Sequence, residues 1–101
     1  MENKIEQQLS KIDLPSDFDL LEPELQKVLI QWIRNNLEAR KTVNKIIGTS
    51  YRLKHIFEKQ TGIYVTNGQF KGAMLACGLI PEPGYESKLN WYFRIKFISK
   101  K

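Results

Sequence analysis

The chain has 101 residues, which is enough for one small domain with a modest core and excludes a two-domain enzyme. Hydrophobic residues make up 42% of it and charged residues 27%, so we expect a folded chain with a strongly solvated surface and a net charge of +5. One cysteine and one histidine exclude an intramolecular disulfide and a zinc site of standard ligand spacing, and no apolar run has the ~18 residues that a membrane span needs.

The first third of the chain is acidic and contains one clear helix. Residues 1–21 are expected to form an acidic, partly ordered segment, and residues 22–101 a winged-helix-like domain. A helix is predicted from about Glu24 to Glu38, because apolar residues recur at helical spacing on one face and Pro23 suits its first turn.

A second helix is predicted over "YRLKHIFEKQ", residues 51–60. Ser50 or Thr49 can act as its N-cap, and Gly62 can end it. The side chains off its apolar stripe are basic or titratable: Arg52, Lys54, His55 and Lys59. We expect them at the surface.

A third helix is predicted over "GQFKGAMLACG", residues 68–78, with Asn67 as its N-cap. Four residues have the i, i+3, i+4, i+7 spacing of a buried face: Phe70, Ala73, Met74 and Cys77. Lys71 projects from this helix. Gly72 lowers its intrinsic stability, so we expect a kink or the close approach of another backbone segment there.

Three later segments favour β structure: "IYV" at residues 63–65, "GLI" at 78–80 and the terminal "NWYFRIKFISKK" at 90–101. Read with period two, the terminal run has an apolar face that we expect in the core, made of Trp91, Phe93, Ile95 and Phe97. Its other face carries Tyr92, Arg94, Lys96 and Ile98.

This order of elements predicts an α+β fold, a small single domain with a winged-helix-like helical core and a C-terminal β-hairpin. A winged helix has its first strand between its first two core helices. The match therefore depends on whether "IYV" pairs with the terminal hairpin.

The sequence offers no clear catalytic group. Cys77 and His55 would be the only thiol–imidazole pair, but Cys77 lies in an apolar stripe, which is typical of an inert core residue. His55, beside Lys54, fits a phosphate contact or a surface position better than a general base. Phosphate-loop and metal-loop spacings are absent. We expect no enzymatic activity, no cofactor, no membrane contact and a reducing, cytoplasmic setting.

The charges are divided unevenly along the chain. Residues 1–39 have eight acidic and four basic side chains, and residues 40–101 have three acidic and twelve basic ones. Such asymmetry indicates that the C-terminal part meets a polyanion. The alternative is a solvated surface with uneven charge.

The mixed face of the terminal run suits a single nucleic-acid strand. Tyr92 can stack on a base, and Arg94 and Lys96 can meet phosphates at intervals of ~7 Å. In the alternative interpretation, Tyr92 packs beneath another element and the cations protect an edge strand from aggregation. Lys88 lies where a wing would be. The third helix offers Asn67 and Lys71 but otherwise small or apolar side chains, which favours sequence-tolerant binding over base reading.

"TSYRLKHIFEKQTGIYVTNGQFKGAMLACGLIPE", followed by "LNWYFRI", resembles a family of small proteins of Gram-positive mobile elements and phages, in particular those carried beside the replication genes of staphylococcal cassette chromosomes. The resemblance covers roughly residues 41–98, and the chain has Arg52 where the family pattern has a small residue. It implies a winged-helix-like domain that binds single-stranded DNA and serves replication of the element. Positions matching the family motif that could touch DNA are Lys54, His55, Asn67 and Lys71.

The first expectation is thus a non-enzymatic, sequence-tolerant single-stranded DNA-binding protein. The alternative is an accessory subunit of a replication polymerase or helicase, bound through the acidic N-terminal third and Ile30 on the polar side of the long helix. A duplex-specific transcriptional repressor ranks last, because the third helix offers few polar side chains that could contact base edges.

Overall fold

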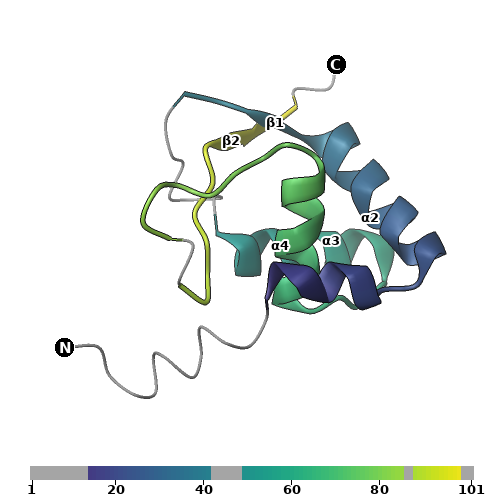
Figure 1. The fold of residues 1–101 in the computed structure, drawn as a ribbon. Helices are drawn as coiled ribbons and strands as arrows, with labels where there is room; N and C mark the ends of the chain where they lie inside the picture. The colour runs from purple at the N-terminus through teal and green to yellow at the C-terminus, as the bar shows by residue number, and fades with distance from the viewer. Residues whose placement is uncertain (1–13, 42–48, 86–87, 99–101) are drawn as a thin grey trace.

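The computed structural model describes residues 14–41, 49–85 and 88–98. The chain order is a 3-10 helix η1 (Pro15–Leu20), α2 (Pro23–Asn36), β1 (Leu37–Ala39), α3 (Ser50–Thr61), α4 (Asn67–Ala76) and β2 (Ile95–Phe97). These elements form one small α+β domain, as expected (Figure 1). Residues 1–13 of the predicted acidic segment lie outside the described residues.

Each long helix begins and ends for a local reason. Pro23 opens α2, and the chain becomes extended at Leu37, where β1 begins. The Thr49 hydroxyl accepts a hydrogen bond from the Arg52 N–H at the start of α3, and Gly62 ends that helix with φ of 74°. These boundaries agree with the sequence to within a few residues.

The N-cap of α4 differs from the prediction. Thr66, not Asn67, caps the helix, in a capping box in which Thr66 and Gln69 each accept a hydrogen bond from the other's backbone N–H. Both residues are of a type that can cap, and the glutamine three positions after Thr66 favours it. Asn67 is instead the first helical residue and is buried.

The sheet pairs two segments that are distant in sequence. β1 runs antiparallel to β2, with Glu38 opposite Lys96. The expectation that "IYV" is a strand is wrong, because residues 63–65 have no strand structure and join α3 to α4. The strand that lies between the first two core helices is β1, which has the position that a winged helix requires.

The terminal segment is paired on both sides. Beyond β1, it forms an isolated bridge between Phe93 and Pro81, and the Glu82 N–H donates to the Tyr92 carbonyl at 2.7 Å. These contacts form the short C-terminal hairpin. The Ser50 N–H also donates to the Trp91 carbonyl at 2.8 Å, so the same segment holds the start of α3.

The core lies between the helices and the inner face of the terminal segment. Trp91, Phe93 and Ile95 are buried, as the period-two pattern predicts, whereas Phe97 at the end of β2 is exposed. Trp32 of α2 meets the Phe57 ring edge-on at 5.5 Å between centroids. The aromatic cluster thus connects α2 with α3.

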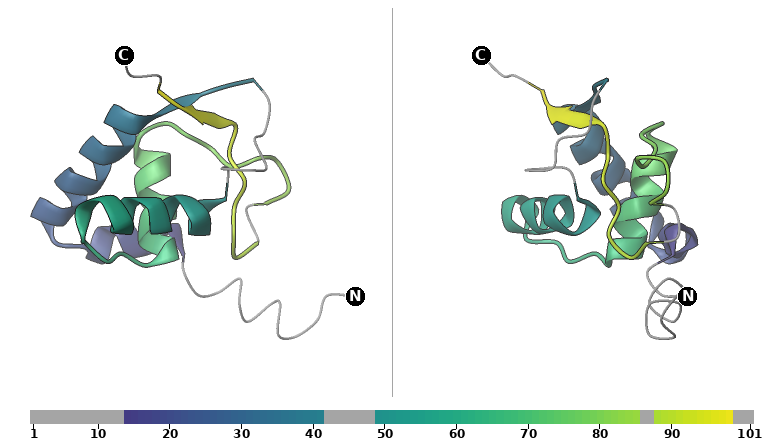
Figure 2. Two further views of the ribbon diagram at one scale, coloured as in Figure 1. Left: turned by 180° about the vertical axis from the view of Figure 1, so that it is seen from behind. Right: turned by 90° about the vertical axis from the view of Figure 1, so that its left-hand side faces the viewer.

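α4 is the central helix, and η1 packs directly on it. In the side view α4 lies between α3 and η1 (Figure 2). A Cβ at Gly72 would collide with the Pro15 carbonyl oxygen and the Phe18 Cβ. Gly72 therefore permits the close backbone approach that its position in the helix predicted.

Candidate nucleic-acid interface

Lys54 is enclosed by its own helix and by the segment after it. Only 5% of its surface is exposed, and its ammonium lies 2.9 Å from the Glu58 carboxylate. Glu58 also accepts a hydrogen bond from the Val65 N–H. The expectation of a surface lysine is therefore wrong, because Glu58 one turn later draws the ammonium inward.

Two exposed tyrosines flank the Lys54 ammonium. Its nitrogen lies 5.5 Å from the Tyr51 ring centroid and 4.9 Å from that of Tyr64. Tyr51 is 50% exposed and Tyr64 is 72% exposed. The His55 ring meets Tyr51 edge-on at 4.4 Å, and His55 Nδ1 lies 3.4 Å from Glu58. We call Tyr51, Lys54, His55 and Tyr64 the tyrosine face.

Neither tyrosine was singled out from the sequence, although both could have been found. Tyr51 lies three and four residues before Lys54 and His55, the helical spacing of one face. Tyr64 stands between Ile63, which packs against the core, and Val65, which is buried. An outward-pointing aromatic residue follows from that alternation even without a strand.

Asn67 and Lys71 are also buried, and both hold residues 88–90, which we call the wing segment. The Asn67 amide donates to the Leu89 carbonyl at 2.9 Å and to the Asn90 side chain at 3.0 Å. The expectation that Lys71 projects from α4 is wrong. It is 3% exposed, its ammonium donates to the Lys88 carbonyl, and it lies 4.9 Å from the Trp91 ring centroid.

α4 consequently presents little to a DNA duplex. Seven of its ten residues are buried, and the two that are exposed are Leu75 and Ala76. The Gln69 side chain is engaged in the capping box. A helix that reads bases in the major groove needs polar side chains at its surface, and α4 has none among its exposed residues.

The outer face of the terminal segment is basic but paired with acids. The Arg94 guanidinium donates to both Glu82 oxygens at 2.6 and 2.8 Å, and the Lys96 ammonium lies 3.2 Å from Glu38 on β1. These hydrogen bonds from Arg94 hold the pKa of Glu82 below its usual value. Tyr92 is half-buried, with its ring edge-on to Tyr85 at 5.2 Å.

The two remaining predicted site residues, Arg52 on α3 and Lys88 in the wing segment, are exposed. The nine candidates thus fall into three groups. Arg52, Lys54 and His55 belong to α3; Asn67, Lys71 and Lys88 meet where α4 holds the wing segment; Tyr92, Arg94 and Lys96 lie on the terminal segment. Nothing in the structure tests their contact with DNA, so that contact stays a prediction.

Cys77 and His55 do not form a catalytic pair. Cys77 packs against the core beyond the end of α4, and its thiol donates to the Ile30 carbonyl at 3.9 Å. Burial raises the pKa of the Cys77 thiol, and the nearby Arg34 opposes this shift. Ile30 is itself partly buried, so its expected exposure on the polar side of α2 is wrong.

In the described parts of the chain, no group of three or more His, Cys, Asp or Glu side chains could hold a metal ion. None of the helices described is both long and apolar enough to cross a membrane. Comparison with known proteins found no matching family model, no matching curated protein and no matching solved structure.

Proposed function

We propose that this chain is a non-enzymatic, sequence-tolerant single-stranded DNA-binding protein of the cytoplasm. The observation that carries the proposal is the tyrosine face. Two exposed aromatic rings held beside a cation offer stacking surfaces for unpaired bases, and every base has a π-face, so stacking tolerates any sequence.

Lys54 has a positioning role in this proposal. Its ammonium is engaged with Glu58 and both rings, so it orders the two tyrosines instead of meeting a phosphate. Phosphate contacts fall to the exposed cations of the same helix, Arg52 and Lys59. Neutralising phosphates releases condensed counterions, which makes binding sensitive to salt.

The geometry of α4 supports the preference for single strands. Asn67 and Lys71, which a duplex-reading helix would direct into the groove, are buried against the wing segment. A duplex-specific repressor is therefore the least supported of the three functions.

The resemblance of residues 41–98 to small proteins of Gram-positive mobile elements supports the biological setting of this proposal. The protein would serve replication of such an element, close to a helicase and a polymerase.

The test is fluorescence anisotropy of labelled single-stranded and duplex DNA of one sequence at two salt concentrations. We expect tighter binding to the single strand, weakened by salt. Negligible binding to both, or a preference for the duplex, would contradict the proposal.

The accessory-subunit alternative is supported by a separate surface. An open cavity of about 510 Å³ lies along α2 and the end of α3, with Val28 and Trp32 among its lining residues. A polymerase or helicase could bind there or on the acidic residues before it. Co-expression with neighbouring replication proteins followed by size-exclusion chromatography tests this alternative, and separate elution would count against it.

A further inference from the structure

His55 is the only histidine of the chain, and it lies within the tyrosine face. Histidine is the side chain whose charge ordinarily changes between about pH 5 and 8. The His55 side chain is 51% exposed, its Nδ1 lies 3.4 Å from Glu58, and its ring meets Tyr51 edge-on. A proton bound here therefore changes the charge of the surface on which the proposed function depends.

The other charges of this cluster cancel. Glu58 Oε2 accepts a hydrogen bond from the Lys54 ammonium at 2.9 Å and another from the Val65 N–H at 3.1 Å. Its second oxygen, Oε1, faces His55. Among the described residues, Tyr64 approaches this cluster from outside α3, and its contact is with Lys54. Because one carboxylate and one ammonium sum to zero, the cluster is neutral with a neutral imidazole and has one positive charge when His55 is protonated.

Two exposed cations flank His55 on the surface of α3. Arg52 lies three positions before it and Lys59 four positions after it, the spacings that place side chains next to one another on a helix. The helix rises by about 10 Å from Arg52 to Lys59, so a phosphate that lies between these two cations also lies beside the imidazole. The three side chains thus form one row along the helix.

The contact with Glu58 decides what the imidazole can offer to a phosphate. A neutral imidazole has one N–H donor, and a carboxylate beside Nδ1 favours the donor at that nitrogen. Nε2 is then an acceptor, which cannot bond to a phosphate oxygen. A protonated imidazole donates from both nitrogens, so Nδ1 can face Glu58 while Nε2 donates to the phosphate. A phosphate contact at His55 therefore requires a second proton on the ring.

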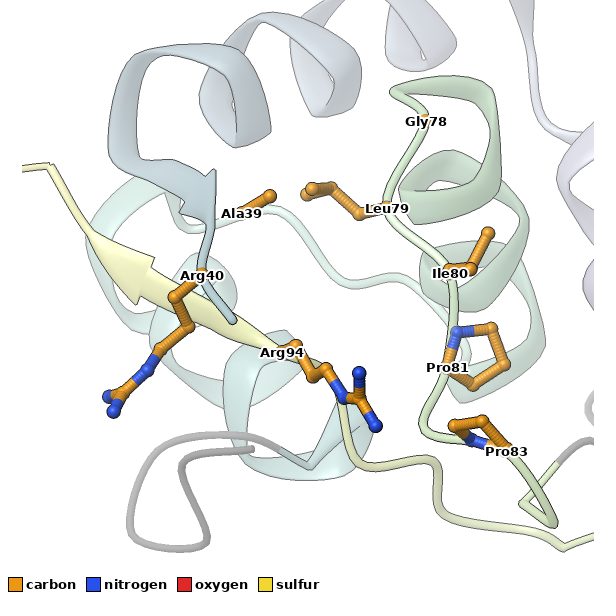
Figure 3. Close-up of a pocket in the computed structure, with 8 residues that line it drawn as sticks. All are labelled: Ala39, Arg40, Gly78, Leu79, Ile80, Pro81, Pro83 and Arg94. Carbon is orange, nitrogen blue, oxygen red and sulfur yellow. The ribbon is translucent and has the colours of Figure 1, made fainter. Parts of the chain in front are cut away.

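The arginines at the cavity of about 260 Å³ beside the terminal segment provide no such response to pH. Arg94 already donates to both oxygens of Glu82, and Figure 3 shows the Arg40 guanidinium directed away from the cavity. Arginine also keeps its charge throughout this pH range. A response of DNA binding to pH should therefore arise at the tyrosine face.

We propose that single-stranded DNA binds to the tyrosine face with uptake of one proton by His55, whose Nε2 then donates to a phosphate between Arg52 and Lys59. This inference rests on the proposed function and adds a regulation to it. Because the bound state holds the proton more tightly than the free state, affinity is high at low pH and falls as pH rises through the histidine range. One linked proton limits the fall to about tenfold per pH unit.

The test is the affinity for a labelled oligothymidine over about pH 5 to 8, at constant salt, for the wild type, His55→Gln and His55→Arg. Glutamine is neutral and arginine is charged throughout, and both are good helix formers at this exposed position. We expect the wild-type affinity to fall by about tenfold or more over the series, since a charge-assisted hydrogen bond is lost. Both variants should change little with pH. His55→Arg should bind more tightly than His55→Gln, and because both lack the imidazole contact with Tyr51, their difference reports the charge.

A second measurement follows the proton itself. Because the chain has a single histidine, its two imidazole nitrogens give one pair of ¹⁵N signals. At one pH near neutrality, we expect saturating oligothymidine to move these signals towards their positions at low pH. Three results would each overturn the inference while the proposed function stands: wild-type binding that does not change with pH, a pH dependence that persists in His55→Gln, or imidazole signals that DNA leaves in place. Absence of binding at every pH would overturn both.

Discussion

At the scale of single residues, charge counted along the sequence overstates the cations available to a ligand. Lys54 and Lys71 are both predicted at helix surfaces, yet each lies buried against aromatic rings and a carboxylate or carbonyl. Helical spacing places Lys54 off the apolar stripe, but it contains no information on the partners that draw the side chain inward. The exposed tyrosines around Lys54 are the more informative signal.

Cys77 provides a residue-scale test of the core. Its pKa is raised by burial, so at neutral pH a smaller fraction is the reactive thiolate than for a free cysteine. We expect iodoacetamide to alkylate Cys77 more slowly in the folded protein than in denaturant, measured by intact mass. Because the folded pKa is the higher one, this group's contribution to stability is present below the unfolded pKa and is lost as pH rises through the folded value. Labelling of the folded protein at a rate equal to or faster than that in denaturant would contradict the burial of the Cys77 thiol.

At the scale of elements, the packing of η1 on α4 predicts the effect of adding one methyl group. Alanine at position 72 would gain up to ~1 kcal/mol in helix propensity. The collision of the new Cβ with the Pro15 carbonyl oxygen costs about 1 to 3 kcal/mol, because a backbone atom, unlike the end of a flexible side chain, cannot move aside easily. We expect Gly72→Ala to lower the free energy of unfolding in urea. The difference between Gln31→Ala and Gln31→Gly, at an exposed position inside α2, measures the alanine–glycine propensity term alone. A Gly72→Ala variant more stable than the wild type would refute the close approach.

The ion pairs of the terminal segment require a matched deletion. Arg94 has five N–H donors, of which Glu82 engages two, so phosphate contact remains open to it. Removing Arg94 alone would leave Glu82 to repel DNA. The informative variant therefore has alanine in place of both partners of both ion pairs, Glu38–Lys96 and Glu82–Arg94. Because two acids and two bases are removed, its net charge is unchanged.

If Arg94 and Lys96 bind phosphates, this fourfold alanine variant should bind a single strand more weakly. The slope of log affinity against log salt should then fall by about 0.7 for each phosphate that is no longer neutralised. Affinity and slope equal to those of the wild type would remove the terminal segment from the site.

The elements that the sequence predicts well are those with local causes. Leu53 and Phe57 at helical spacing, the glycine at position 62 and the alternation of Trp91, Phe93 and Ile95 depend only on near neighbours, and all appear in the structure as expected. The pairing of Leu37–Ala39 with Ile95–Phe97 does not depend on near neighbours alone. Three residues at the end of a helix are too few to show the alternation of apolar and polar side chains that predicts a strand. Their strand forms because the terminal segment supplies its partner.

At the scale of the whole molecule, some acids of the first third and some cations of the remainder lie on different helices, although Glu38 and Lys96 pair across the sheet. η1 and the start of α2 carry the exposed acids Asp19, Glu22 and Glu24, while Arg52 and Lys59 lie on α3. A strand of DNA on the tyrosine face would leave the acidic surface accessible to a second protein molecule. The two charged surfaces would thus meet two kinds of partner.

One binding comparison decides whether bases stack on Tyr51 and Tyr64. The affinity of the wild type is measured for an oligothymidine and for an abasic strand of equal length. The same two affinities are measured for the double variants Tyr51→Ala/Tyr64→Ala and Tyr51→Phe/Tyr64→Phe. At ~1 to 3 kcal/mol per stacked base, we predict a preference of about tenfold or more for the strand with bases. The alanine variant should lose that preference and the phenylalanine variant should keep it. Equal binding of both strands by the wild type would contradict stacking on the tyrosine face.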